Sequence, residues 1–157
     1  MRPNIKKLLV CIAIPLLVGG IAGLLTRTGT QAYATMAKPP LSPPAIVFPI
    51  VWTLLYILMG ISSYLIWTKT EGSSAGSKAK NLYFYQLVAN FLWSFFFFNF
   101  QWYFFSFLWI LLLWGLVFAM IKAFSEISKL AAFLNIPYLI WLTFAAYLNF
   151  GAWLLNR

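Results

Sequence analysis

Long apolar stretches alternate with short polar segments along the whole chain. A bilayer core about 30 Å thick needs about 20 apolar residues in a helix, because each residue adds 1.5 Å. Lipid offers no partners to backbone polar groups, so each stretch is expected to be helical. The pattern predicts an all-α integral membrane bundle of five transmembrane helices, forming one domain over residues 1–157, with spans at about 8–25, 45–67, 82–100, 104–124 and 137–155.

The polar segments indicate how the spans are connected. Residues 68–80 hold three Lys, one Glu and a Gly/Ser cluster, which is typical of a flexible loop. Residues 99–103 form so short a connection that the third and fourth spans are predicted to be antiparallel neighbours. The first stretch, after Lys6 and Lys7, also has the form of a cleaved signal peptide, although it is long and lacks a clear cleavage site.

Composition narrows the function classes. The chain is 63% hydrophobic and 8% charged, against about 45–50% and 25% in soluble domains, which excludes a water-soluble globule. Eleven Lys and Arg against two acids give a net charge of +9, but no polar face carries that charge toward nucleic acid. With one cysteine, no histidine and only Glu71 and Glu126 as acids, we expect no metal site and neither paired-carboxylate nor Ser-His-Asp catalysis.

The basic residues favour one orientation in the bilayer. Short loops on the cytoplasmic side carry an excess of Lys and Arg. We therefore expect an inside N-terminus and, with five spans, an outside C-terminus. The N-terminal side holds Arg2, Lys6, Lys7, Lys69, Lys78, Lys80, Lys122 and Lys129, and the other side holds Arg27, Lys38 and Arg157.

Polar and aromatic side chains form stripes within three of the spans. Gln86, Asn90 and Trp93 share one face of the third helix. An interhelical hydrogen bond that only holds the bundle together is the alternative role of the two amides. On the second helix, Trp52 and Tyr56 share one face with small residues.

On the fifth helix Trp141, Ala145 and Asn149 repeat every four residues. The convergence of one Trp from each of three helices predicts a hollow for a flat ligand. Lipid contact or core packing is the alternative role of each Trp.

Residues 38–44, which precede the second span, are predicted to form a rigid lid. Its four prolines each fix their own φ and restrict the preceding residue; a stiff helix stop is the alternative role. Lys38 and Arg27 lie in or beside it and are candidates to meet a ligand carboxylate. Gly19 and Gly23 form a small-residue pair in the first span that allows close helix approach, within the bundle or between subunits.

The chain resembles the translocator protein family, also known as tryptophan-rich sensory proteins or peripheral benzodiazepine receptors. The resemblance extends over essentially the whole chain. It is carried by residues 33–39, Pro43-Pro44, Phe48, Val51-Trp52-Thr53, Leu55-Tyr56, Met59-Gly60, Tyr64-Leu65, Gln86-Leu87, Asn90, Trp93, Phe96-Phe97, Pro137-Tyr138-Leu139, Trp141, Phe144-Ala145 and Leu148-Asn149.

This resemblance implies a bacterial plasma-membrane protein, often a homodimer, that binds tetrapyrroles such as protoporphyrin IX and drugs of the isoquinoline carboxamide and benzodiazepine classes. It implies protoporphyrin IX as a ligand rather than a covalent cofactor. Carried over by position, the implied ligand-binding residues are Tyr33, Pro43, Phe48, Trp52, Asn90, Trp93, Trp141, Ala145 and Leu148.

Several functions remain open at this stage. The first is porphyrin binding and sensing. The second is light- and oxygen-dependent porphyrin breakdown, with Trp52 and Trp141 as candidate catalytic residues and the chemistry supplied by the ligand. The third is passive transport of porphyrin or other apolar ligands, since no ionisable group lies at mid-membrane in these spans to couple active transport. The sterol motif of animal relatives is absent, because Phe150 stands at its tyrosine position.

Overall fold

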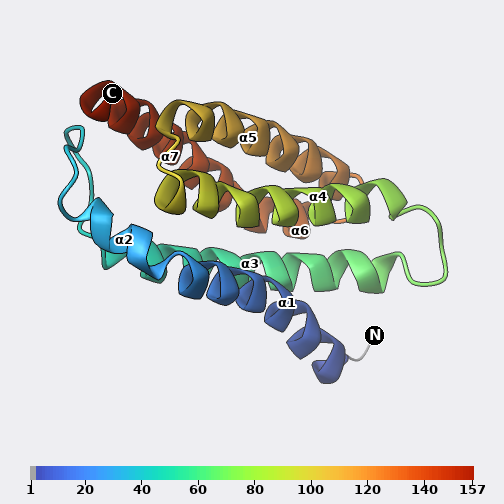
Figure 1. Cartoon of the computed structure of the whole chain (residues 1–157). Helices are drawn as coiled ribbons and strands as arrows, with labels where there is room; N and C mark the ends of the chain where they lie inside the picture. Colours follow the sequence, from blue (N-terminus) through green and yellow to red (C-terminus); the bar gives the residue numbers. More distant parts are fainter. Residues whose placement is uncertain (1–2) are drawn as a thin grey trace.

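A computed structural model describes residues 3–157, most of which are helical and none of which forms a strand. Figure 1 shows the long helices running side by side, with the two termini at opposite ends of the bundle. The elements are α1 (Ile5–Leu25), α2 (Arg27–Tyr33), α3 (Val47–Lys69), α4 (Ser77–Ser94), the π-helix η1 (Phe95–Asn99), α5 (Tyr103–Ser125), α6 (Lys129–Leu134) and α7 (Ile136–Asn156).

Local sequence explains where several helices begin and end. The Asn4 side chain accepts a hydrogen bond from the Lys7 amide at 3.1 Å and caps α1. Ser128 caps α6 in the same way through the Ala131 amide at 3.1 Å. The lid is followed by α3, whose first turn includes Pro49. Proline lacks an N–H, and it is tolerated there because the first N–H groups of a helix have no partner within the helix.

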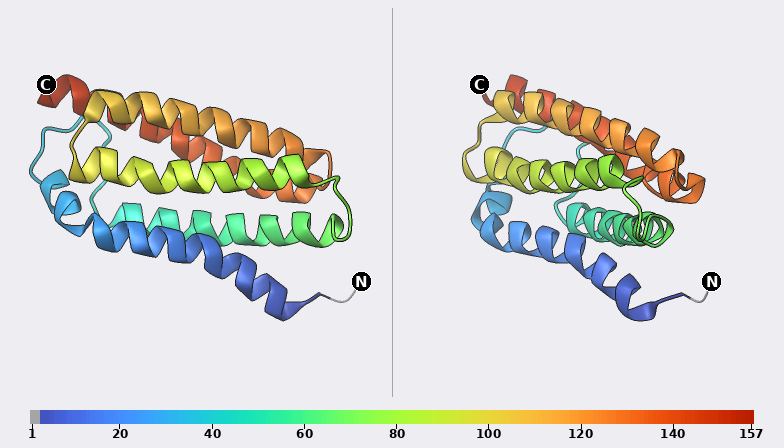
Figure 2. Two further views of the ribbon diagram at one scale, coloured as in Figure 1. Left: turned by 45° about the vertical axis from the view of Figure 1, so that its right-hand side comes forward. Right: turned by 90° about the vertical axis from the view of Figure 1, so that its right-hand side faces the viewer.

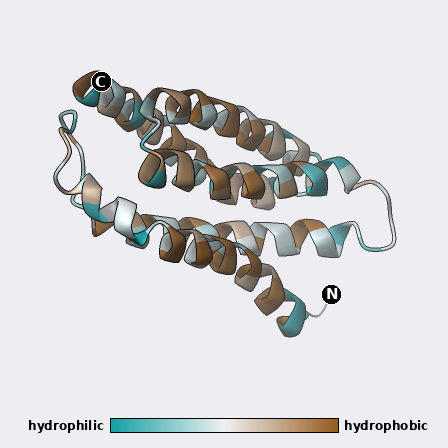
Figure 3. Cartoon of the chain, in the orientation of Figure 1, coloured by the Kyte–Doolittle hydropathy of each residue, from teal (hydrophilic) through white to brown (hydrophobic). Residues whose placement is uncertain are grey.

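Among residues 3–157, four helical stretches are long and apolar enough to cross a membrane: α1, α3, α5 and residues 129–156, which comprise α6 and α7. Figure 3 shows apolar residues along the helices, with hydrophilic residues more frequent at the ends of the bundle. On α1, Leu9, Leu17 and Leu24 are each at least 60% exposed, so one face of this helix has no protein partner. The helix formed by α4 and η1 is less apolar, because it begins with Lys78 and Lys80 and carries buried amides.

The long helices pack mainly in three pairs. α1 packs mainly on α3, α4 on α5, and α5 on α7, while α6 returns to α3. The predicted antiparallel pairing of the third and fourth apolar stretches is therefore confirmed by the contact of α4 with α5. Figure 2 shows the same layers from two further sides, with the lid and α2 at the end of the bundle opposite the N-terminus.

The small residues of α1 have two different environments. A Cβ at Gly19 would overlap the Tyr56 ring, so this glycine brings α1 close to α3 within the chain. Gly20 and Gly23 instead border open space, because no neighbouring atom lies within 4 Å of the place that a Cβ would take. Of the Gly19–Gly23 pair, Gly19 therefore allows close packing of α1 on α3, and Gly23 leaves space beside α1.

Candidate ligand-binding site

Aromatic rings from α2, α3, α4 and α7 meet at the lid end of the bundle. Trp52 is at the centre, with its ring centroid 6.4 Å from those of both Trp93 and Trp141 and 5.6 Å from that of Tyr56. Phe48 links Trp141, at 5.9 Å, to the lid-side residue Tyr33, at 5.1 Å. The three indoles therefore converge inside the bundle. Trp52 and Trp141 lie edge to face at 89° instead of stacking in parallel.

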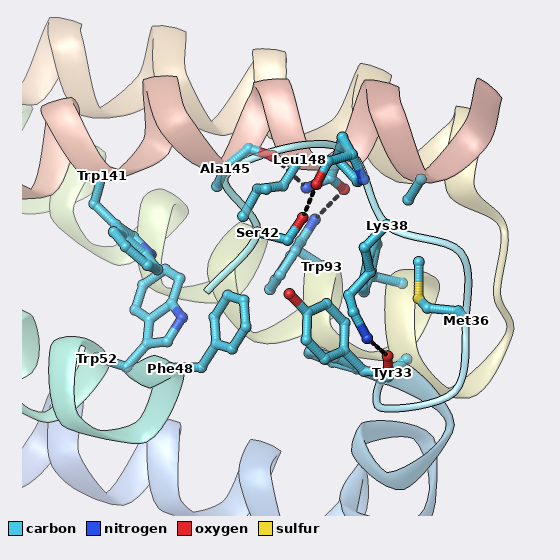
Figure 4. Close-up of a pocket in the computed structure, with 15 residues that line it drawn as sticks. Tyr33, Met36, Lys38, Ser42, Phe48, Trp52, Trp93, Trp141, Ala145 and Leu148 are labelled. Carbon is cyan, nitrogen blue, oxygen red and sulfur yellow. Dashed lines mark hydrogen bonds between the residues drawn. The ribbon is translucent and has the colours of Figure 1, made fainter. Parts of the chain in front are cut away.

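Two cavities border this cluster. The first, the inner slot, has a volume of only about 20 Å³, little more than one water molecule requires. Figure 4 shows labelled side chains around it. It is lined by Tyr33, Met36, Lys38, Pro39, Ser42, Phe48, Trp52, Trp93, Phe97, Phe98, Trp141, Ala145, Leu148, Asn149 and Ala152.

The second, the outer cavity, has a volume of about 700 Å³, within the range typical of small-molecule sites. It lies between α1, α2, the start of α3, α4 and η1, and three glycines of α1 border it: Gly19, Gly20 and Gly23. Five aromatic residues border both cavities and form a partition between them: Tyr33, Phe48, Trp52, Trp93 and Phe98.

A hydrogen-bond network lies beside the outer cavity. Tyr56 Oη donates to Asn90 Oδ1 at 3.0 Å, and Asn90 Nδ2 donates to Tyr138 Oη at 2.7 Å. Tyr138 Oη in turn donates to Gln86 Oε1 at 2.7 Å. These four side chains, from α3, α4 and α7, are all buried. The network fixes the position of Tyr56 and Tyr138, against which the Trp52 ring packs.

The first part of the lid is fastened to α7 through Pro39, Pro40 and the preceding residue, Ala37. Asn156 clasps the Ala37 backbone, accepting from its amide at 3.2 Å and donating to its carbonyl at 2.7 Å. Tyr147 Oη donates to the Pro40 carbonyl at 2.7 Å, and Pro39 packs on Gly151. The predicted lid therefore covers the inner slot from the end of the bundle.

Lid residues also bind one another. Lys38 Nζ donates to the Tyr33 carbonyl at 2.9 Å and lies 4.8 Å from the centre of its ring. Tyr33 Oη donates to the Pro43 carbonyl at 3.3 Å. Burial raises the pKa of the Tyr33 phenol above its ordinary value, while a hydrogen bond with Ser42 acts in the opposite direction.

The structure brings most of the predicted site residues together. Asn90 borders the outer cavity. Pro43 borders neither cavity and contributes its carbonyl to Tyr33. The remaining predicted residues line the inner slot: Tyr33, Phe48, Trp52, Trp93, Trp141, Ala145 and Leu148.

Sequence reasoning missed two contributions to the site. Tyr138 joins Asn90 to Gln86, but a tyrosine in an apolar span carries no signal that separates such a role from packing. Gly20 and Gly23 border the outer cavity. The glycine pattern of α1 indicates helix contact, and only the course of α1 past α3 shows that these two glycines leave space.

Comparisons with known proteins agree with this architecture. Residues 11–154 match the model of the TspO/MBR family. The chain is 36% identical to a protein named tryptophan-rich protein TspO from Chlorobaculum tepidum, over 99% of both chains. It is 39% identical to the protein of the same name from Archaeoglobus fulgidus, over 98% of this chain and 99% of that one.

An animal protein is similar over a comparable stretch. The chain is 37% identical to the translocator protein of Ovis aries, over 88% of this chain and 84% of that one. Both the family model and these relatives cover far more than half of the chain. With its long apolar helices, the chain is an integral membrane protein and belongs to the TspO/MBR family.

Proposed function

We propose that this protein binds a flat tetrapyrrole, with protoporphyrin IX as the representative ligand, and senses it. The observation that carries the proposal is the outer cavity of about 700 Å³ bordered by an aromatic partition. Aromatic faces suit the π-face of a macrocycle. Lys38, which borders the inner slot on the other side of the partition, is the cation that we propose to receive a propionate. Aromatic drugs of the isoquinoline carboxamide and benzodiazepine classes fit the same surroundings.

The proposal includes a fifth membrane crossing. α4 and η1 together run over residues 77–99 without a break, which at 1.5 Å per residue is long enough for a bilayer. Gln86 and Asn90 face the interior of the bundle, as polar groups in a membrane helix do. Five crossings in a bacterial plasma membrane, with the N-terminus inside and a homodimeric assembly, complete this proposal.

Porphyrin titration tests the proposed site. The porphyrin's own absorbance serves as the signal, because the variants change the number of tryptophans. We expect Trp52→Ala with Trp141→Ala to weaken binding at least tenfold, equivalent to about 1.4 kcal/mol. The matched control is Trp67→Ala with Trp114→Ala, which removes two indoles that border neither cavity. Equal affinities for the two double variants would contradict the proposed site.

Light-dependent porphyrin breakdown is the second candidate, favoured by the contact of Trp52 with Trp141 across the slot. In this function the bound porphyrin supplies the photochemistry with oxygen, and an indole exchanges an electron with it. The decay of porphyrin absorbance under constant illumination tests it, with each protein saturated by ligand. Slower decay with Trp141→Phe is expected, and equal decay would leave binding alone.

A further inference from the structure

Lysines gather at the end of the bundle that lies opposite the lid. The first turns of α1, α4 and α6 and the last turns of α3 and α5 lie at this end (Figure 1). The Lys7–Glu71 ion pair, at 3.5 Å, joins α1 to the loop after α3, and the contact of the Tyr83 and Phe124 rings, at 6.4 Å, joins α4 to α5. We call this set of lysines the basic end: Lys6, Lys7, Lys69, Lys78, Lys80, Lys122 and Lys129.

The acids at this end neutralise little of the charge. Glu71 is paired with Lys7, and Glu126 has no ion pair among residues 3–157. Seven lysines against two glutamates leave this end with a formal charge of +5 in the described part of the chain. Four of these lysines are exposed and make no side-chain hydrogen bond, ion pair or ring contact with residues 3–157: Lys6, Lys69, Lys78 and Lys129.

Cations at the lid end differ in this respect. Lys38 Nζ donates to the carbonyls of Tyr33 and Ala34, at 2.9 and 3.1 Å. The Arg157 guanidinium lies 5.6 Å from the centre of the Trp153 ring. Lys38 and Arg157 are therefore engaged by the chain itself, whereas the basic end presents four cations with no partner among the described residues.

The basic end lies at the depth of the lipid headgroups. α3 has 23 residues, which at 1.5 Å per residue is about 35 Å, longer than a hydrocarbon core of about 30 Å. Lys69, its last residue, therefore reaches the headgroups. The half-buried Trp67 fits the same depth, because tryptophan favours the membrane interface. Lys80 Nζ lies 5.1 Å from the centre of the Trp67 ring, so the start of α4 reaches this depth as well.

We propose that the basic end binds the phosphate groups of anionic phospholipids and thereby enriches these lipids around this end of the protein. Lysine ammonium groups bind phosphate as point charges, and basic clusters beside membrane helices attract anionic lipids. A lipid suits this place because the bilayer holds its phosphate at the same depth as the unpartnered ammonium groups. The inference does not depend on the proposed porphyrin site. It assigns these lysines a role that continues after insertion has fixed the orientation of the chain.

Lipid selectivity in bilayers tests the inference. The full chain is reconstituted in phosphatidylcholine, and electron spin resonance compares its association with phosphatidylglycerol and phosphatidylcholine that carry a spin label on the acyl chain. At low salt we expect a preference of about two- to fourfold for phosphatidylglycerol, falling toward one in about 1 M NaCl, where the screening length is about 3 Å. Combining Lys69→Gln, Lys78→Gln and Lys129→Gln should at least halve this preference. The matched control, with Arg at the same three positions, should retain it because the charge is kept.

A second measurement locates the lipid. Trp67 beside Lys80 and Trp153 beside Arg157 are matched pairs of a ring and a cation at opposite ends of the bundle. With 5-fluorotryptophan in the protein, the ¹⁹F resonance of Trp67, assigned by its loss in Trp67→Phe, should shift when phosphatidylglycerol is added to neutral detergent micelles. The resonance of Trp153 should shift less. Equal association of the two lipids at low salt, an unchanged preference in the glutamine variant, a lost preference in the arginine variant, or a larger shift of Trp153 would each overturn the inference.

Discussion

The buried network around Tyr138 gives a prediction whose size follows from its geometry. Replacing Tyr138 by Phe removes one hydroxyl that accepts from Asn90 Nδ2 and donates to Gln86 Oε1. Tyr138 is 1% exposed, Gln86 0% and Asn90 2%, so water cannot replace the lost partner. Interhelical hydrogen bonds in membranes contribute about 0.6 kcal/mol on average and at most about 1.7. The two bonds together predict a loss of about 1–3 kcal/mol in the free energy of unfolding.

The assay is reversible unfolding in bicelles, followed for Tyr138→Phe and for Tyr147→Phe. Tyr147 lies on the same helix and also loses one hydroxyl, but that hydroxyl is exposed and contacts only the Pro40 carbonyl. We expect the Tyr147 variant to lose less than about 0.5 kcal/mol. Adding Gln86→Leu to Tyr138→Phe should cost less than the sum of the single losses, because the second change removes a stranded acceptor. Equal stability of both tyrosine variants would refute the reasoning.

Three further predictions concern α1 and the lid. Gly19→Ala should lower the melting temperature in detergent because its methyl group overlaps the Tyr56 ring, whereas Gly23→Ala, which faces open space, should leave it unchanged or slightly higher. Asn156→Ala removes the two hydrogen bonds to the Ala37 backbone at the start of the lid. This variant should speed the reaction of a thiol probe with a cysteine introduced at position 42. An unchanged rate would show that these hydrogen bonds do not hold the lid. Burial favours the neutral Tyr33 phenol. The contribution of this phenol to lid closure is therefore present below pH 10 and is lost as the pH rises through its elevated pKa. The same thiol assay should show the lid opening at alkaline pH, and Tyr33→Phe should abolish this pH dependence.

The helices are predictable because the constraint on them is simple. Each apolar stretch has to be long enough to cross a bilayer and has to pair its own backbone, and the observed long helices lie close to the predicted ranges. The short helices α2 and α6 do not follow from the apolar pattern. α6 forms where Ser128 caps a stretch that the apolar pattern assigns to a connection between two spans. This stretch is too short to be recognised as a helix among its polar neighbours in the sequence.

The candidate site is predictable in its residues but less so in its shape. Gln86 and Asn90 form interhelical hydrogen bonds, which is the alternative role that the sequence allows them. The spacing on each helix places Trp52 and Trp141 on inward faces. Their edge-to-face angle depends on the packing of α3 against α7, which helical periodicity does not specify. Where the three indoles predict a hollow for a flat ligand, the structure has a slot of about 20 Å³ with a larger cavity beside it.

This division of the site has a physical consequence for binding. On one side the hydrogen-bond network holds Tyr56 and Tyr138 in fixed positions, so Trp52 packs against a surface that cannot easily give way. On the other side Gly20 and Gly23 leave space beside α1. A ligand entering that space presses on aromatic rings that are held firmly from behind. An adjustment that joins the two cavities must therefore come from rotation of Phe48 or from movement of the lid, so we expect the fastening of the lid to α7 to slow the exchange of the proposed ligand.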